Sequence, residues 1–175
     1  MESMIQNALS SAKNYEGLTV GQANIKVICC GGAGNNMGSW LFKKGIHGAE
    51  IIAVNTDMQH LEISDAHKKI LIGRDLTRGL GCGGYPEKGR ESAKESIHDL
   101  KETLRGADMV FICGGLGGGT GTGSMPVVAQ IAKESGAIVI GTVTMPFDIE
   151  RARVDKAEFG LQELREMSDT VIVID

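Results

Sequence analysis

Glycine is the residue type whose placement in this sequence most directly suggests chemistry. The chain has 25 glycines among 175 residues, and they concentrate in three runs at residues 31–38, 79–89 and 114–123. A glycine lets an anion approach the backbone without a Cβ in the way. Its amide, together with the N-terminus of a following helix, presents N–H donors and a positive dipole end to a phosphate. One such run would be equally consistent with a tight turn, but three together predict a phosphate-binding site.

Apolar segments precede these glycine runs and predict the strands that position them. Between the segments lie helical patterns such as residues 86–104, where Ala93, Ile97, Leu100 and Leu104 form one apolar face. Strands that are apolar throughout and alternate with helices favour a parallel sheet covered on both faces. The sequence therefore predicts a three-layer, Rossmann-like, doubly wound α/β fold. The predicted strands are 25–30, 50–55, 68–73, 107–113, 137–145 and 170–174.

The position of the glycine runs within this predicted sheet is informative. Each run comes after one of the predicted strands, namely 25–30, 68–73 and 107–113. Ligands of open parallel sheets bind at the carboxyl ends of the strands. The three runs are therefore expected to converge on one edge of the sheet. We expect residues 23–175 to form this binding domain, and residues 1–22 to be an N-terminal extension with a short helix within 2–14.

Composition and charge exclude several classes of protein. The net charge is −4 without a block of like charges, which argues against a nucleic-acid or membrane-surface partner. No run approaches the ~20 apolar residues of a spanning helix, and residues 1–15 do not resemble a signal peptide. The four cysteines form no CxxC pair and have no nearby histidines that would complete a metal site. Cys29, Cys30 and Cys113 lie within or beside apolar runs, so reduced, packed thiols are expected there. The sequence thus predicts a cytoplasmic protein without direct membrane insertion.

Two common phosphate-binding motifs match poorly. A Walker A loop requires a lysine directly after its last glycine, and none of the three runs provides one. The dinucleotide fingerprint G-x-G-x-x-G fits only in part, because Met37 stands at its third glycine position. Asp57 could take the place of the ribose-binding acid of that motif. An NAD-dependent oxidoreductase therefore remains one alternative.

The segment GGLGGGTGTGS (114–124) resembles the G-G-G-T-G-T-G signature of the tubulin and FtsZ superfamily of GTPases. GGAGNN (31–36) is similar to the first nucleotide loop of that family, Asn55-Thr56-Asp57 to the second and LTRGLGCGGYP (76–86) to the third. VTMPFDIE (143–150) is similar to the ribose loop. The resemblance covers nearly the whole chain and implies the GTPase-domain fold of this family.

The resemblance also implies roles for individual residues in four loops. It places Gly32, Ala33, Gly34, Asn35 and Asn36 along the α- and β-phosphates and the nucleoside, Gly118, Gly119, Thr120, Gly121, Thr122 and Gly123 around the phosphates, Cys82, Gly83 and Gly84 at the γ-phosphate, and Thr144, Pro146 and Glu150 at the ribose. Two positions depart from the family pattern. Tyr85 stands where the family usually has asparagine, and Val154 stands where it has its γ-phosphate arginine. We assign the arginine role to Arg153 rather than Arg151.

The mechanism that the resemblance implies is GTP hydrolysis between subunits. GTP or GDP would bind with Mg²⁺, which would be held through phosphates and water rather than by direct protein ligands. The chain would associate with itself head to tail through its nucleotide face, at the division site in the cytoplasm. Membrane-tethering division proteins are the other partners implied, and no nucleic acid is expected.

The resemblance further implies that this chain stops before the C-terminal activation domain, with its guanine-reading acid and synergy loop. No catalytic residue is then expected in the chain itself, and the fragment alone should not hydrolyse GTP. Tyr85 and the altered arginine spacing keep a second alternative open, a paralogue of the same family that binds nucleotide without hydrolysing it.

Overall fold

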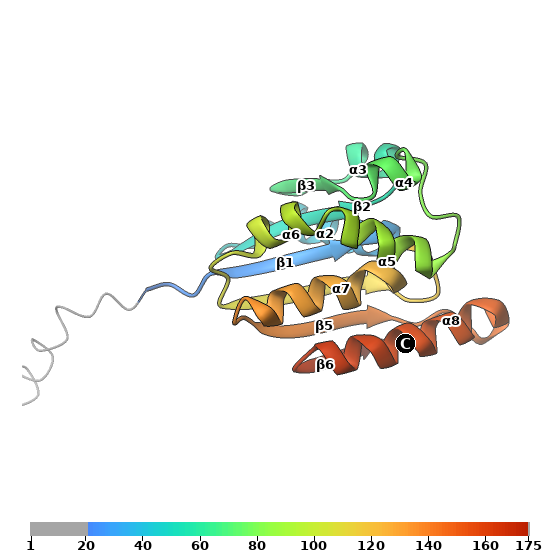
Figure 1. The fold of residues 1–175 in the computed structure, drawn as a ribbon. Coiled ribbons are helices and arrows are strands. Elements are labelled where there is room, and N and C mark those ends of the chain that lie inside the picture. Colours follow the sequence, from blue (N-terminus) through green and yellow to red (C-terminus); the bar gives the residue numbers. More distant parts are fainter. Residues whose placement is uncertain (1–20, 175) are drawn as a thin grey trace, which may run out of the picture.

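The computed structural model describes residues 21–174. The helix predicted within residues 2–14 lies outside the described residues. The described chain forms one six-stranded sheet with helices on both faces (Figure 1). None of the helices in residues 21–174 combines the length and apolar composition needed to span a lipid bilayer.

The six strands lie at the positions that the sequence predicts, and all of their pairings are parallel. Their order across the sheet is β3-β2-β1-β4-β5-β6, so that β1 and β4 lie at the centre. The predicted doubly wound parallel sheet is thereby confirmed. The strands are β1 (Ile25–Cys30), β2 (Ala49–Asn55), β3 (Lys68–Leu71), β4 (Met109–Gly115), β5 (Ile138–Thr144) and β6 (Thr170–Ile174).

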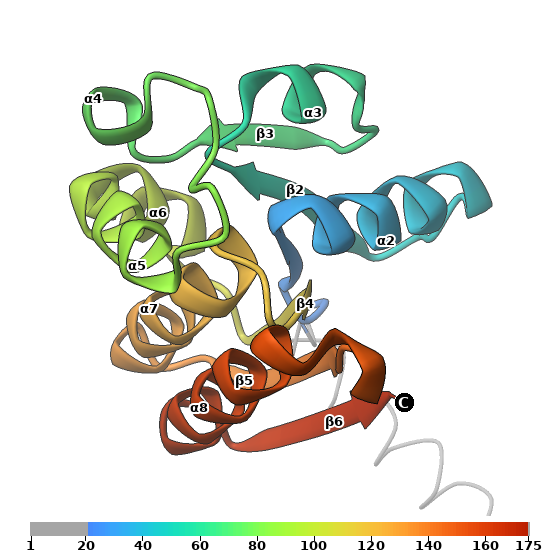
Figure 2. The same cartoon turned by 90° about the vertical axis from the view of Figure 1, so that its right-hand side faces the viewer.

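Two layers of helices bury the two faces of the sheet. Figure 2 looks along the sheet and shows α5 (Pro86–Glu95), α6 (Ile97–Leu104), α7 (Thr120–Glu134) and α8 (Arg151–Met167) on one face, with α2 (Gly31–Lys44) on the other. The larger core lies under α5 to α8 and includes the fully buried Ile52, Ile112 and Val139. A smaller core lies under α2 and contains Cys29 and Cys113.

Two helices begin within glycine-rich segments, and one predicted helix is divided into two. Helices α2 and α7 begin at Gly31 and Thr120, so the glycine-rich segments themselves form their first turns. The segment predicted as one helix over 86–104 is divided at Ser96, which leaves helical geometry while its hydroxyl accepts a hydrogen bond from the N–H of Gly73 at 3.1 Å. The short helices α3 (Met58–Ile63) and α4 (Arg74–Thr77) had no periodic signal in the sequence.

Candidate functional site

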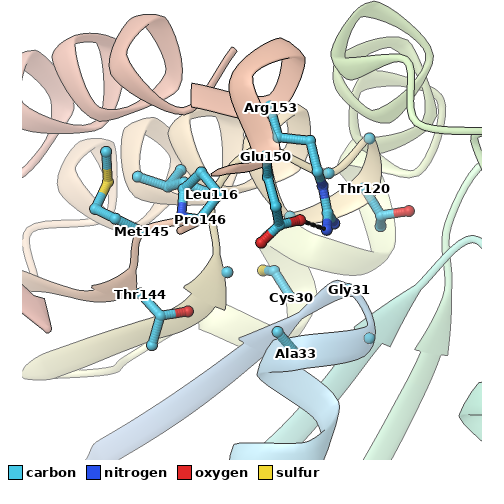
Figure 3. A pocket seen from close by; sticks show the side chains of 15 residues that line it. Cys30, Gly31, Ala33, Leu116, Thr120, Thr144, Met145, Pro146, Glu150 and Arg153 are labelled. Atoms are coloured by element: carbon cyan, nitrogen blue, oxygen red, sulfur yellow. Dashed lines mark hydrogen bonds and ion pairs between the residues drawn. The ribbon is translucent and has the colours of Figure 1, made fainter. Parts of the chain in front are cut away.

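A cavity of about 350 Å³ opens at the carboxyl ends of β1, β4 and β5 (Figure 3). This volume lies within the usual range for small-molecule sites. Backbone from the first loop (residues 31–36) and from the glycine-rich segment 114–124, called the fourth loop from here on, forms much of the wall, and a few side chains complete it. The lining residues are Cys30, Gly31, Gly32, Ala33, Gly115, Leu116, Gly118, Gly119, Thr120, Gly121, Thr144, Met145, Pro146, Glu150 and Arg153.

The N-termini of α2 and α7 meet at this cavity. Neither N-cap residue, Cys30 or Gly119, provides a side-chain hydrogen bond to the first turn of its helix. The first amides of both helices are therefore available to an anion. The two helix ends approach closely, because a Cβ on Gly31 would lie 2.9 Å from the amide nitrogen of Gly121. Gly31 also has φ +70°, a conformation that favours glycine.

Glu150 and Arg153 lie side by side in the lining of the cavity (Figure 3). Their side chains form an ion pair of 2.5 Å, and the hydrogen bond from Arg153 lowers the pKa of the Glu150 carboxyl. The Nε–H of Arg153 also donates to the carbonyl oxygen of Gly117, at 3.5 Å. Arg151 does not line this cavity but borders another hollow with Asp148 and Asp155. The geometry therefore favours Arg153 as the residue that meets a ligand here.

The two asparagines of the first loop differ in accessibility. The side chain of Asn35 is fully buried and donates to the carbonyl oxygen of Cys29 at 2.7 Å, while its own oxygen accepts from Asn55 at 2.8 Å. Asn55 in turn accepts from the N–H of Thr56. Asn36 is exposed beside the cavity. Asn35 therefore ties the first loop to the ends of β1 and β2, and Asn36 is the asparagine available to a ligand.

The third loop (residues 76–86) lies beside the cavity without lining it. Its Cys82 is buried, and the thiol lies 3.4 Å from the hydroxyl of Thr56 and 3.5 Å from that of Thr120. The two hydroxyls are themselves 2.7 Å apart. This cluster places the third loop against the start of α7. Thr56 was not among the predicted site residues, because nothing in its sequence context marks it as a partner of Cys82.

The predicted glycines of the fourth loop fall into two groups. A Cβ on Gly121 would lie 2.7 Å from the carbonyl oxygen of Gly115, and one on Gly123 would lie too close to that of Pro86. These two glycines allow close packing of α7 on β4 and α5. A Cβ on Gly118 would meet only the Nη2 atom of Arg153, at 3.9 Å, so Gly118 faces open space in the cavity wall.

Four further residues that were predicted to bind nucleotide lie in the loops around the cavity without lining it. Thr122 is buried, and its hydroxyl accepts from the N–H of Gly117 at 2.9 Å, which shapes the fourth loop from within. A Cβ on Gly34 would lie 2.5 Å from the carbonyl oxygen of Cys113, so this glycine seats α2 on the sheet. Gly83 and Gly84 belong to the third loop and do not line the cavity.

The sequence did not single out His60, which lies at the edge of the first loop. Its Nε2 atom is 3.2 Å from the Oδ1 of Asn36, and its ring covers Gly32, whose Cβ would lie 3.3 Å from the Cε1 atom. His60 follows Asp57, whose side chain caps α3 by accepting from the N–H of His60 at 3.0 Å. Helix α3, which follows β2, thus supplies a side chain to the edge of the first loop.

The reactivity of Cys30, which lines the cavity, tests whether this side chain is shielded from solvent. Its side chain is fully buried, and burial raises the pKa of the thiol to about 12. Only about one thiol in ten thousand would then be ionised at pH 8, and the thiolate is the reactive form. We expect no adduct on Cys30 when the native chain is treated with iodoacetamide at pH 8 and analysed by peptide mass spectrometry. Alkylation in denaturant is the control, and native labelling of Cys30 at the denatured rate would contradict this shielding.

Comparison with known proteins agrees with this arrangement. A family model described as the GTPase domain of the Tubulin/FtsZ family matches residues 24–175. The chain is 57% identical over 174 residues to cell division protein FtsZ 2 of Methanocaldococcus jannaschii, covering 98% of this chain and 46% of that relative. It is 47% identical over 183 residues to FtsZ 2 of Halobacterium salinarum, covering 100% of this chain and 47% of the relative.

Solved structures show the same similarity. An FtsZ dimer from M. jannaschii, described as empty, superimposes with a TM-score of 0.88 at 50% identity, covering 94% of this chain and 48% of that one. A CetZ2 protofilament with bound GTPγS, from Haloferax volcanii, gives a TM-score of 0.78 at 27% identity, covering 87% and 49%. The chain spans about half the length of the curated relatives that it matches.

Proposed function

Because the chain belongs to the Tubulin/FtsZ family of GTPase domains, we propose that it binds GTP and GDP at the cavity between α2 and α7. The whole protein would act in cell division, as the names of its relatives indicate. Its place of action would be the cytoplasm at the division site.

The observation that carries this proposal is the convergence of two uncapped helix N-termini on one cavity. Two sets of amide donors and two positive dipole ends suit a chain of phosphates. Arg153 adds a guanidinium group, which is paired with Glu150, and Thr144 and Pro146 also line the cavity (Figure 3). We place the phosphates against Gly32, Ala33 and residues 118–121, and the ribose against Thr144, Pro146 and Glu150.

Magnesium would accompany the triphosphate. Mg²⁺ usually keeps several waters and binds through phosphates and one or two protein oxygens. The hydroxyl of Thr120, in the cavity wall at the start of α7, would hold a water of the ion. The charge that the ion supplies would stabilise the phosphates while the terminal phosphoryl group is transferred to water.

Hydrolysis would need a group that the cavity wall does not provide. The titratable residues among its described lining are Cys30, Glu150 and Arg153. The pKa of Cys30 is raised to about 12, and Glu150 is paired with Arg153. We propose that a second subunit, docked over the cavity, supplies the group that orients the attacking water. The dimer and the protofilament among the similar structures support head-to-tail self-association. Membrane-tethering division proteins would be further partners.

Calorimetric titration of the chain tests this proposal. In buffer with Mg²⁺, GTP and GDP should each bind with one site per chain, and NADH should give no heat of binding. Tight NADH binding without guanine nucleotide binding would instead identify a dinucleotide enzyme. Arg153→Met should weaken GTP by about tenfold, because it removes a charged hydrogen bond to phosphate. Arg151→Met is the matched control, since Arg151 lies outside the cavity.

A further inference from the structure

Lysine side chains of two neighbouring helices lie beside the third loop. Lys156 of α8 donates from its Nζ to the carbonyl oxygen of Gly84, at 2.9 Å. The same Nζ lies 5.7 Å from the ring centroid of Tyr85. Lys88 of α5 lies at the same distance from that ring, at 5.7 Å. The ring of Tyr85, which stands in place of the usual asparagine, therefore lies near two lysine ammonium groups, one from α5 and one from α8.

The loop that Lys156 contacts has little intrinsic rigidity. Gly81, Gly83 and Gly84 all have positive φ, and glycines lose the most conformational freedom when they are ordered. The inner end of the loop is fixed, because Cys82 packs against Thr56 and Thr120. At the outer end the backbone of Gly84 lies near Gly119, where an added Cβ would be 3.2 Å from the Gly84 carbonyl carbon. A Cβ on Gly84 itself would have no atom within 4 Å, so one side of this residue is open. The hydrogen bond from Lys156 supplies a restraint there.

Helix α8 thereby holds two loops at once. Arg153, one turn before Lys156, donates to the carbonyl oxygen of Gly117 in the fourth loop. Residues three apart lie on the same side of a helix. The first turns of α8 thus contact the fourth loop through Arg153 and the third loop through Lys156. Further along, Glu163 pairs with Arg90 of α5, which fixes α8 relative to the helix that follows the third loop.

We propose that Lys156 is a positioning residue that holds the third loop beside the cavity, in the place where this loop meets the terminal phosphate of GTP. The inference rests on the proposed function. Tyr85 is the partner that keeps the Lys156 ammonium over the loop. Since the first and fourth loops bind the inner phosphates without help from Lys156, loosening the third loop should affect GTP and not GDP.

The test compares Lys156→Met, which keeps much of the aliphatic stem, with Lys156→Arg, which restores a donor. If the docked fraction of the loop falls to about one fifth, apparent GTP affinity falls about fivefold. Titration should show this loss for GTP in Lys156→Met, with GDP affinity unchanged. Lys156→Arg should recover most of the GTP affinity. Lys88→Met is the matched control and should change neither, because Lys88 faces the same ring without bonding the Gly84 carbonyl.

Hydrogen exchange in the nucleotide-free chain provides an independent readout. The amide of Tyr85, which donates to the carbonyl oxygen of Cys82 at 3.2 Å, should exchange at least about fivefold faster in Lys156→Met than in the wild type, because the undocked fraction of the loop would rise from about one sixth or less to about four fifths. Unchanged exchange, or an equal loss of GTP and GDP affinity, would overturn the proposal. Failure of the proposed function gives a different result from failure of this inference. In that case the wild-type chain would bind neither GTP nor GDP.

Discussion

Replacing Gly118 with aspartate should strongly weaken nucleotide binding while leaving the fold intact. The new side chain would project into the cavity, where a Cβ meets only Arg153 Nη2 at 3.9 Å. A carboxylate about 5 Å from a phosphate costs roughly 3 kcal/mol at an effective dielectric constant near 20. This corresponds to a loss of about a hundredfold in affinity for both GTP and GDP. Calorimetric titration measures the loss, and urea unfolding should show an unchanged midpoint.

Gly21→Asp is the matched control for this variant. Gly21 is exposed, and a Cβ there would have no atom within 4 Å. The residue precedes β1, whose opposite end forms part of the cavity. The control makes the same change of net charge and should bind nucleotide like the wild type. Equal affinity in Gly118→Asp and Gly21→Asp would show that the fourth loop does not touch phosphate.

Gly123→Ala should produce the largest loss of stability among single methyl additions in α7. The added Cβ would lie 2.6 Å from the amide nitrogen of Arg90 and closer still to the carbonyl oxygen of Pro86. Both are backbone atoms of α5, so the two helices must separate. Overpacking of this kind typically costs 1–3 kcal/mol, and we expect about 3 kcal/mol here because no flexible side chain can yield. Urea unfolding followed by circular dichroism measures the change in the free energy of unfolding.

Gly118→Ala is the corresponding control, since it adds the same methyl group where space is open. Its free energy of unfolding should stay within about 0.5 kcal/mol of the wild type. For a chain of this size, Gly123→Ala should also lower the melting temperature by roughly 10 °C. Roughly 2–4 °C are expected per kcal/mol in a chain of this size. A melting temperature of Gly123→Ala within about 2 °C of the wild type would therefore contradict the close packing of α5 against α7.

The sheet could be predicted from the sequence because its central strands each contain a run of apolar residues. Ile28, Ile52 and Ile112 lie in such runs and are buried. The charged residues of β1 and β2, Lys26 and Glu50, lie near the strand starts and pair with each other at 2.7 Å. Helix starts were harder to predict. Glycine has low helix propensity, so Gly31 and Thr120 do not look like helix starts, yet packing against the strand ends makes both segments helical.

The site could be predicted as a set of loops but not as a set of contacts. Gly34, Gly118 and Gly123 look alike in the sequence, and only the neighbours of each show which one faces the cavity. Asn35 and Asn36 differ by one position along α2, which turns the first into the core and the second outward. The contact of Lys156 with Gly84 joins residues 72 positions apart, and no local pattern could indicate it.

Nuclear magnetic resonance of the 18.5 kDa chain tests the central claim, that amides of the glycine-rich helix starts bind phosphate, most directly. Backbone amide shifts would be followed in ¹⁵N-labelled protein as Mg²⁺-GDP is added. We expect the largest saturable shifts at Gly32, Ala33 and residues 118–121, with little change at the opposite end of the sheet. Saturable binding that leaves these amides unshifted, with the largest changes elsewhere on the chain, would contradict the account.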